Sequence, residues 1–323
     1  MSFVFKNVLA AAVITFASLS ASLSASTAPS FAQQWRALQP LDTGRARAGV
    51  AMVDGEIYVA GGSGLTGPED AFEVLDPIGE HWRPLPSMPT GREHFGMAAL
   101  GKELYIVGGF TSNSNNQPTR TVQIFNTVTQ SWRNGANMPG VRSGHSVVSH
   151  NGKLYVMGGR GTSPQDVYVY DPSRNQWRTS TVRLTVARES MAALVNKGRI
   201  FLIGGRGLTG QVTGRVESWD PTGGQWRRHR DLPVARSGLT AATVGGRIHV
   251  AGGESLKPLR TYANHDIYNQ GSDAWAKGQK LSSPRQGLVS AAVDGRWYVI
   301  GGGAGAGFLT VFTPSDLVEV YGP

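Results

Sequence analysis

Residues 142–159 read RSGHSVVSHNGKLYVMGG, and the same arrangement recurs five more times along the 323-residue chain. Each copy ends in a Gly-Gly pair, with an arginine 16 residues before it and an aromatic residue or histidine three residues before it. The pairs begin at Gly61, Gly108, Gly158, Gly204, Gly252 and Gly301, and the arginines are Arg45, Arg92, Arg142, Arg188, Arg236 and Arg285. Six copies that share these offsets indicate a repeat architecture.

Each copy predicts four short antiparallel strands and no helix. In the first copy, strands over 49–53 and 57–61 flank Asp54-Gly55, a dipeptide typical of a two-residue hairpin. A variable loop then leads to a third strand, as at 167–170. The fourth strand carries a tryptophan that recurs in step with the glycines, at Trp35, Trp82, Trp132, Trp177, Trp226 and Trp275. The fold class is therefore all-β.

The Gly-Gly pair, the aromatic residue before it, the later aromatic residue and the spaced tryptophan resemble the Kelch repeat. The resemblance covers the whole chain after residue 32. It implies a single six-bladed β-propeller over residues 33–323, with four antiparallel strands in each blade. Packing between blades explains the glycines, since a Cβ finds no room there, and large aromatic side chains fill the wedge between blades.

The two ends of the chain predict how the ring closes. The last copy stops after its third strand, over Leu317–Tyr321, and has no tryptophan strand of its own. The segment Gln34–Leu38 carries Trp35 but has no blade before it. We therefore expect these two segments to pair and complete the sixth blade, with Trp35 packed as Trp82 is packed in its own blade. Such closure removes an open sheet edge.

The N-terminus predicts a secretory signal peptide over residues 1–32. Lys6 supplies the positive region, Val8–Leu19 is an apolar run, and small residues lead to Ser30–Ala32. Cleavage after Ala32 leaves a mature protein that begins near Gln33. We expect that protein to be exported, periplasmic or secreted, monomeric and free of the membrane. An uncleaved anchor is the alternative.

Composition excludes several kinds of chemistry. The chain has no cysteine, which excludes disulfides, zinc–thiolate sites, iron–sulfur clusters and the Cys–Tyr crosslink of galactose-oxidase-like propellers. No two histidines have metal-ligand spacing, so we expect no metal and no cofactor. After cleavage, 30 basic residues against 22 acidic ones leave a net charge of +8, mostly arginine. The excess of arginine has two explanations of equal weight, an anionic partner and a high-GC genome. Scattered charge and export argue against nucleic acid.

The predicted binding face carries the loops between strands 4 and 1 and between strands 2 and 3, because both emerge on one side of an antiparallel blade. We interpret the six repeat arginines as structural, holding backbone carbonyls or a neighbouring acid. The one or two residues after them vary, and in peptide-binding Kelch domains ligand contacts fall at these offsets. The resemblance thus implies six pocket residues: Arg47, Glu93, His94, Ser143, Glu189 and Ser190. Loop cations add positive charge: Arg160, Arg206, Lys257 and Arg260. A solvated rim or channel lining is the alternative.

Two functions from different classes fit this face. The first is a ligand-binding or interaction module for an anionic peptide, protein or acidic glycan. The alternative is a carbohydrate-active enzyme that resembles the exported sialic-acid mutarotases, although those catalytic motifs do not match residue by residue. Such an enzyme needs an acid/base carboxylate, Glu93 or Glu189, and a cation for the substrate carboxylate, Arg47 or Arg206. A carboxylate and an arginine that converge in one mouth pocket would favour the enzyme.

Overall fold

The computed structural model describes residues 33–111 and 117–322, together with Met1. Residues Gln33–Pro323 form one compact unit. The predicted signal peptide, apart from Met1, lies outside the described residues, so it stays a prediction. Among the described residues, no helix is long and apolar enough to cross a membrane.

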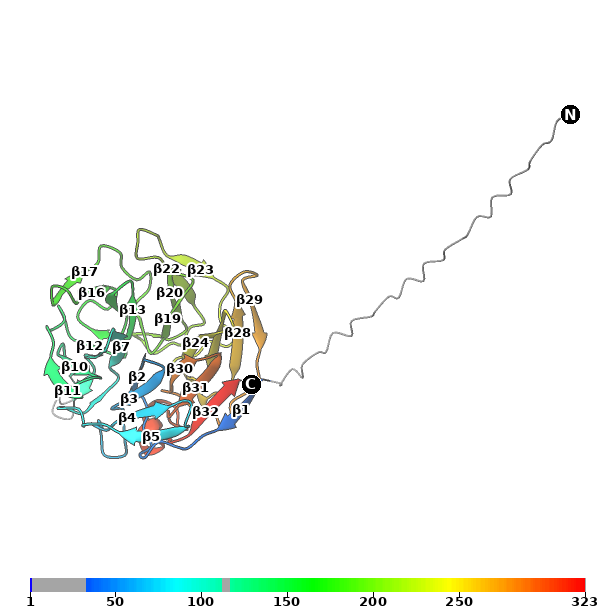
Figure 1. Cartoon of the computed structure of the whole chain (residues 1–323). Helices are drawn as coiled ribbons and strands as arrows, with labels where there is room; N and C mark the ends of the chain where they lie inside the picture. The colour runs from blue at the N-terminus through cyan, green and yellow to red at the C-terminus, as the bar shows by residue number, and fades with distance from the viewer. Residues whose placement is uncertain (2–32, 112–116, 323) are drawn as a thin grey trace. The chain divides into compact units, whose positions relative to one another are not determined.

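The described unit is a ring of six four-stranded antiparallel sheets, or blades (Figure 1). Blade 1 holds β2 (Gly49–Val53), β3 (Glu56–Ala60), β4 (Phe72–Asp76) and β5 (His81–Pro84). Blade 2 holds β7 (Gly96–Leu100), β8 (Glu103–Val107), β10 (Val122–Asn126) and β11 (Ser131–Asn134). Blade 3 holds β13 (Ser146–His150), β14 (Lys153–Met157), β16 (Tyr168–Asp171) and β17 (Gln176–Thr179). Blade 4 holds β19 (Ala192–Asn196), β20 (Arg199–Ile203), β22 (Val216–Trp219) and β23 (Arg227–His229).

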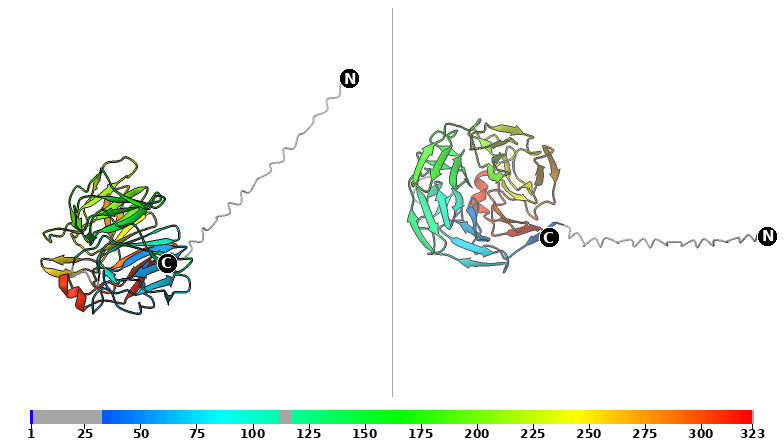
Figure 2. Two further views of the ribbon diagram at one scale, coloured as in Figure 1. Left: turned by 90° about the vertical axis from the view of Figure 1, so that its left-hand side faces the viewer. Right: turned by 45° about the horizontal axis from the view of Figure 1, so that its top comes forward.

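Blades 5 and 6 complete the predicted all-β six-bladed propeller, which the structure confirms. Blade 5 holds β24 (Thr240–Val244), β25 (Arg247–Ala251), β28 (His265–Asn269) and β29 (Ala274–Lys277). Blade 6 holds β30 (Val289–Val293), β31 (Arg296–Ile300), β32 (Val318–Gly322) and β1 (Gln34–Ala37). The predicted strands agree with these to within one residue. Figure 2 shows the ring from two further directions.

Short two-stranded sheets lie where strand 1 begins and strand 2 ends, on the predicted binding face. Three pair two residues with two: β6 (Arg92–Glu93) with β9 (Phe110–Thr111), β12 (Arg142–Ser143) with β15 (Arg160–Gly161), and β18 (Arg188–Glu189) with β21 (Arg206–Gly207). The fourth is the hairpin of β26 (Glu254–Leu256) and β27 (Leu259–Thr261). The long loop of blade 6 carries a 3₁₀-helix, η1 (Gly307–Phe312).

The first and last strands close the ring as the sequence predicts. Strand β1 pairs antiparallel with β32, with Trp35 opposite Tyr321. The Trp35 indole Nε1 donates to the Gln279 carbonyl at 2.7 Å, as the Trp82 Nε1 donates to the Gln39 carbonyl at 3.0 Å. The other four repeat tryptophans make the same bond to the loop that arrives from the preceding blade and leads into strand 1 of their own blade. Each tryptophan is therefore a latch between two blades, and Trp35 is the latch between the two ends.

Backbone geometry explains the recurring dipeptides. Asp54 and Gly55 both have positive φ, 54° and 82°, as the predicted two-residue hairpin requires. Gly158, the first residue of a Gly-Gly pair, has φ 67°, and a Cβ there would lie 2.4 Å from the Arg188 carbonyl oxygen in the next blade. Glycine is thus required at Gly158 both by conformation and by contact between blades.

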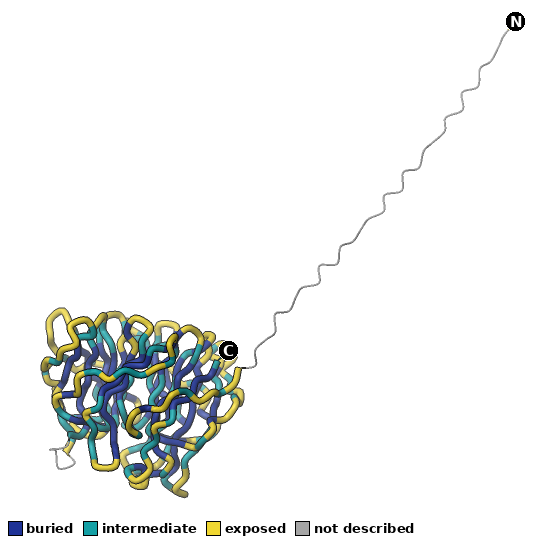
Figure 3. Tube along the Cα trace, turned by 60° about the horizontal axis from the view of Figure 1, so that its bottom comes forward, coloured by how far each residue is buried: buried dark blue, intermediate teal, exposed yellow. Residues whose placement is uncertain are grey.

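The hydrophobic core consists of six clusters, and each one lies between two neighbouring blades. In one cluster, Tyr58 and Phe72 of blade 1 pack with Ile106 and Phe125 of blade 2. Figure 3 shows the result, with buried strands through the body of the ring and exposed loops at its ends. Because the cores hold the blades rigidly, the loop face presents side chains in fixed positions.

Candidate functional site

The six repeat arginines are buried and structural, as predicted. In four blades the arginine donates to the carbonyl of the first glycine in its Gly-Gly pair, at 2.5 to 3.0 Å. This bond joins residues 16 apart and accounts for the invariant offset in the sequence. The repeat arginines therefore fix the turn after strand 2 and belong to the scaffold.

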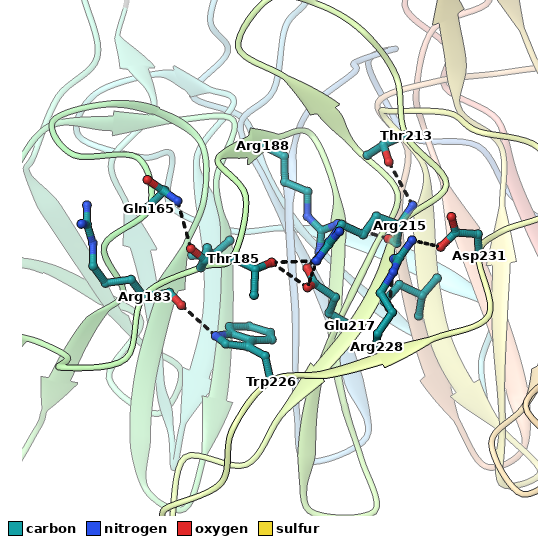
Figure 4. A network of polar contacts seen from close by, with 12 residues as sticks. Gln165, Arg183, Thr185, Arg188, Thr213, Arg215, Glu217, Trp226, Arg228 and Asp231 are labelled. Atoms are coloured by element: carbon teal, nitrogen blue, oxygen red, sulfur yellow. Dashed lines mark hydrogen bonds and ion pairs between the residues drawn. The ribbon is translucent and has the colours of Figure 1, made fainter.

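Most of these arginines also face an acid on strand 3. The ion pairs are Arg45–Glu73 at 2.6 Å, Arg188–Glu217 at 3.0 Å, Arg236–Asp266 at 2.8 Å, and Arg285–Glu319. Figure 4 shows the pair in blade 4, where Thr185 and Arg215 also donate to Glu217 at 2.6 Å each. Blade 3 places Tyr168 at the acid's position, and the guanidinium of Arg142 lies 4.5 Å from its ring centroid. A buried cation without a counter-charge is costly, so each copy supplies one or a substitute.

The residues two positions after the repeat arginines form a closed ring of backbone hydrogen bonds around the propeller axis. Each N–H donates to the carbonyl of the equivalent residue in the adjacent blade, at 2.7 to 3.2 Å. The six members are Arg47, His94, Gly144, Ser190, Gly238 and Gly287, and all have φ between 52° and 65°. This left-handed conformation suits glycine and costs other residues of order 1–2 kcal/mol. Three ring positions nevertheless have a residue other than glycine: Arg47, His94 and Ser190. The conformational cost at these positions points to a use for their side chains.

An axial cavity of about 260 Å³ opens at this ring. Its wall includes all six ring residues and the first strands of the blades. Arg47, His94 and Ser190 are half-buried and supply polar side chains to it. His145 also lines the cavity but is buried, and burial lowers its pKa to about 3, so it is neutral near pH 7.

A second layer of the mouth is made of six cross-strand pairs. In each copy the residue after the repeat arginine faces the residue after the Gly-Gly pair. The pairs are Ala46 with Ser63, Glu93 with Phe110, Ser143 with Arg160, Glu189 with Arg206, Ser237 with Glu254, and Gln286 with Gly303. The mouth chemistry is thus set by two variable positions in each repeat.

Two of the mouth carboxylates are held in an ion-pair network. Glu189 is buried, and its Oε1 accepts from Arg160 Nε at 2.7 Å and from Arg206 Nε at 2.8 Å. Arg206 also donates through Nη1 to Glu254 Oε1 at 2.9 Å. The other oxygen of Glu254 accepts the backbone N–H of Gly307 at 2.6 Å, which ties η1 to the mouth. These carboxylates are ionic anchors for the loops.

Arg47 differs from the other mouth cations. Its Nη2 donates to the Gly307 carbonyl at 3.2 Å and to Thr310 Oγ1 at 3.4 Å. Within residues 33–111 and 117–322 it has no carboxylate within 4.0 Å, unlike Arg160 and Arg206. Burial lowers the pKa of Arg47, an effect that the charges of Glu254 and Glu93 oppose. The axial cavity therefore has a partly buried guanidinium in its wall without a paired acid.

Glu93 and His94 lie where two cavities adjoin. His94 lines the axial cavity, and Glu93 lines a neighbouring one of about 360 Å³. The His94 Nδ1 lies 3.5 Å from Glu93 Oε1. Burial lowers the pKa of His94, so its ring is neutral near pH 7. Burial opposes ionisation of Glu93, but His94, the Ser63 hydroxyl and Arg47 outweigh it, and the pKa of Glu93 is lowered.

Comparison with known proteins identifies the repeat. The model of the KLHDC2/KLHL20/DRC7 Kelch-repeats domain matches residues 25–159 and again residues 144–318. The chain belongs to the Kelch-repeat family. The propeller is thus a Kelch propeller by sequence as well as by fold.

Curated relatives match this Kelch propeller over part of its length. An F-box/kelch-repeat protein of Arabidopsis thaliana is 32% identical over 104 residues, which is 32% of this chain and 27% of that protein. Beta-scruin of Limulus polyphemus is 30% identical over 95 residues, 29% of this chain and 10% of that protein. Human Kelch-like protein 38 is 32% identical over 104 residues, 32% of this chain and 18% of that protein. The matches span about a quarter or less of these relatives.

A solved structure described as "Structure of YjhT" superposes on the Kelch propeller with a TM-score of 0.76. The match covers 88% of this chain and 96% of that one at 20% sequence identity. At that identity the likeness shows the fold. The site must therefore be argued from its own residues.

The Kelch propeller brings together most of the predicted site residues. Arg47, His94 and Ser190 line the axial cavity, and Glu93 lines its neighbour. Ser143 is buried opposite Arg160, whose exposed side chain reaches Glu189 beside Arg206. Lys257 and Arg260 are exposed on the β26–β27 hairpin and line neither cavity.

Sequence reasoning missed several mouth residues: Ser63, Phe110, Glu254, Gln286 and Thr310. For four of them a signal was present, since Gln286 directly follows a repeat arginine, and Ser63, Phe110 and Glu254 each directly follow a Gly-Gly pair. Among the described residues, no group of three or more His, Asp or Glu side chains is arranged to hold a metal ion.

Proposed function

We propose that this protein is an exported, monomeric binding module whose propeller mouth takes an anionic peptide, protein segment or glycan. Kelch propellers commonly bind protein partners, and this role needs only varied side chains on a rigid ring. The proposal includes no cofactor, no nucleic acid and no membrane attachment after cleavage of the signal peptide.

The single observation that carries the proposal is the state of Arg47. Its guanidinium lies in the wall of the axial cavity, partly buried and without a paired carboxylate among the described residues. Guanidinium presents donors in a planar fork that matches a carboxylate or phosphate, and partial burial strengthens such a pair. A ligand anion would supply the counter-charge that the other buried arginines receive from the chain.

Pairs of ligands that differ in negative charge and are otherwise closely matched test this proposal. N-acetylneuraminic acid is compared with its methyl ester, and a glutamate-rich peptide with its glutamine counterpart, by calorimetry at low salt. We expect at least one acid to bind, its neutral twin to bind at least tenfold more weakly, and affinity to fall as salt rises.

Two variants with the same loss of charge give the control. Arg47→Gln should lower affinity for the acid at least tenfold, whereas Arg178→Gln, on the exposed outer strand β17, should leave it unchanged. Equal binding of the acids and their neutral twins, or equal effects of the two variants, would overturn the proposal.

A second candidate is an enzyme of the sialic-acid mutarotase type, favoured by the convergence of carboxylates and arginines in the mouth. The states of the acids argue for binding instead. Glu189 Oε1 already accepts from two arginines, and the lowered pKa of Glu93 makes it a weak base at neutral pH. We therefore expect proton NMR to show no faster anomer exchange of a carboxylated sugar with the protein added. Acceleration that Glu189→Gln abolishes would establish the enzyme.

The export and assembly parts of the proposal have their own tests. N-terminal sequencing of material from the culture medium or periplasm should begin near Gln33, and a retained Met1 would contradict cleavage. Light scattering should give one chain per particle at micromolar concentration. A dimer mass would contradict the monomer.

A further inference from the structure

Glu93 and Glu189 occupy the same position in their repeats but face different partners. Each directly follows the repeat arginine of its copy. Glu189 lies opposite Arg206 in the β18–β21 pair, and the two form an ion pair at 2.8 Å. Glu93 lies opposite Phe110 in the β6–β9 pair. One copy thus neutralises its acid from within the chain, while the other places an aromatic ring at the site of the cation.

The Glu93 carboxylate opens into the cavity of about 360 Å³ beside the axial one. Leu65, Pro68, Phe110 and Val311 supply the apolar part of the cavity wall, and Ser63, Thr66 and Thr111 supply polar groups beside Glu93. The Glu93 side chain is only 18% exposed, and no lysine or arginine of the described residues lies within 4.0 Å of it. Its close basic neighbour is His94, and burial lowers the pKa of His94, so that its ring is neutral near pH 7. The cavity therefore contains an ionised, largely desolvated carboxylate that no lysine or arginine of the described residues contacts, although the charge of Arg47 acts on it from a distance.

We propose that this cavity binds a monovalent organic cation, a protonated amine or a guanidinium carried on a short apolar stem. The carboxylate supplies a charge-assisted hydrogen bond to the cationic head. The Phe110 ring favours a cation and packs against the stem, as Leu65 and Val311 also do. A divalent metal is a poor fit, because one carboxylate falls far short of the oxygen ligands such ions require.

The cation site adjoins the anion site and is chemically distinct from it. Glu93 and His94 are consecutive, and they line one cavity each. The helix η1 also contributes to both, since Arg47 donates to Gly307 and Thr310 while Val311 lines the cation cavity. A ligand that filled both cavities would carry one negative and one positive group. Neither site depends on the other for its argument.

Three probes test the cation site by calorimetry or NMR titration: n-pentylammonium, neutral n-pentanol, and the blocked peptide acetyl-Gly-Lys-Gly-amide. We expect n-pentylammonium to bind at least tenfold more tightly than n-pentanol. Binding of the peptide as well would identify a lysine side chain of a partner as the source of the cation, and binding of the free amine alone would identify a small molecule. Equal binding of amine and alcohol, or no binding of either cation, would overturn the proposal.

Variants separate this site from the anion site. Glu93→Gln should weaken n-pentylammonium binding at least tenfold. Phe110→Arg should do the same while keeping Glu93, because it copies the Glu189–Arg206 pair and supplies the cation internally. Glu103→Gln is the matched control and should leave binding unchanged. Glu103 lies at the end of β8 away from Phe110 and pairs with Arg133.

Arg47→Gln distinguishes failure of one proposal from failure of the other. It removes a nearby positive charge that acts on Glu93, so amine binding should stay equal or become tighter while anion binding is lost. Circular dichroism checks that every variant used in these comparisons has the melting temperature of the wild-type protein. Unchanged amine affinity in both Glu93→Gln and Phe110→Arg would show that the cation binds elsewhere.

Discussion

Replacement of Trp35 by alanine removes the latch between the two ends of the ring. The Trp35 indole is half-buried, with its ring centroid 5.3 Å from that of Trp297 and 5.1 Å from that of Tyr321. Truncation of a fully buried tryptophan costs roughly 3–5 kcal/mol, and half-burial lowers this to about 2 kcal/mol. Loss of the 2.7 Å bond to the Gln279 carbonyl adds about 1 kcal/mol. The expected loss is therefore about 3 kcal/mol.

Urea and thermal unfolding measure this loss. A destabilisation of about 3 kcal/mol lowers the melting temperature of a large domain by roughly 6–12 °C. Trp35→Phe is the matched control, since it keeps a ring in the pocket and removes the indole donor, and we expect about a third of the effect. Trp82→Ala should cost as much as Trp35→Ala, because Trp82 makes the equivalent bond to Gln39.

Deletion of residues 33–38 should destabilise further, since it also exposes the edge of β32. A synthetic peptide of residues 33–42 should restore part of the lost melting temperature when added in excess. The reasoning fails if Trp35→Ala and the deletion variant both have the melting temperature of the full-length protein. It also fails if Trp82→Ala lowers the melting temperature strongly while Trp35→Ala leaves it unchanged.

Three further predictions concern the scaffold. Burial holds the pKa of His249 at about 4, below its value of about 6.5 in the unfolded chain, so the free energy of unfolding should fall as pH drops from about 6.5 towards 4. His249→Tyr should therefore reduce the difference in unfolding free energy between pH 7 and pH 5 by about 1–2 kcal/mol, and an unchanged difference would contradict this. Asp266→Asn leaves Arg236 buried without its counter-charge and should lower the urea midpoint by an amount equivalent to roughly 3–5 kcal/mol, whereas a loss below 1 kcal/mol would refute a structural role for the pair. Gly238→Ala should cost at least about 1 kcal/mol in the same assay, because φ there is 63° and the added Cβ would lie 2.6 Å from Gln286 Oε1; a wild-type midpoint would contradict the backbone ring.

The fold could be predicted because its determinants are local and repeated. The hydrogen bond from Arg142 to the Gly158 carbonyl fixes a 16-residue offset that is visible in the sequence. Closure at Trp35 could be predicted for the same reason, since one repeat lacked a tryptophan and one tryptophan lacked a repeat. Strand ends shifted by one residue because hydrophobic alternation does not mark where pairing stops.

The site could be predicted only where it follows the repeat. Arg47 and His94 stand at a fixed offset from a repeat arginine, so their place at the mouth follows from the ring. Arg206 pairs with Glu189 of its own repeat and with Glu254 of the next blade, and no spacing along the chain reveals the contact between blades. Thr310 lies in a long loop with no counterpart in the other copies. The exposed position of Lys257 and Arg260 depends on the hairpin of β26 and β27, which the repeat does not encode.

The side-chain Nε–H of Arg47, observed by NMR, tests the proposed anion site most directly. Its resonance is assigned as the arginine signal that Arg47→Gln removes. On titration with the acidic ligand found by calorimetry, we expect this signal to shift and to saturate with the calorimetric Kd, while the neutral twin leaves it unmoved. A ligand that binds with the same Kd while the Arg47 resonance stays in place would contradict the assignment of Arg47 as the anion receptor.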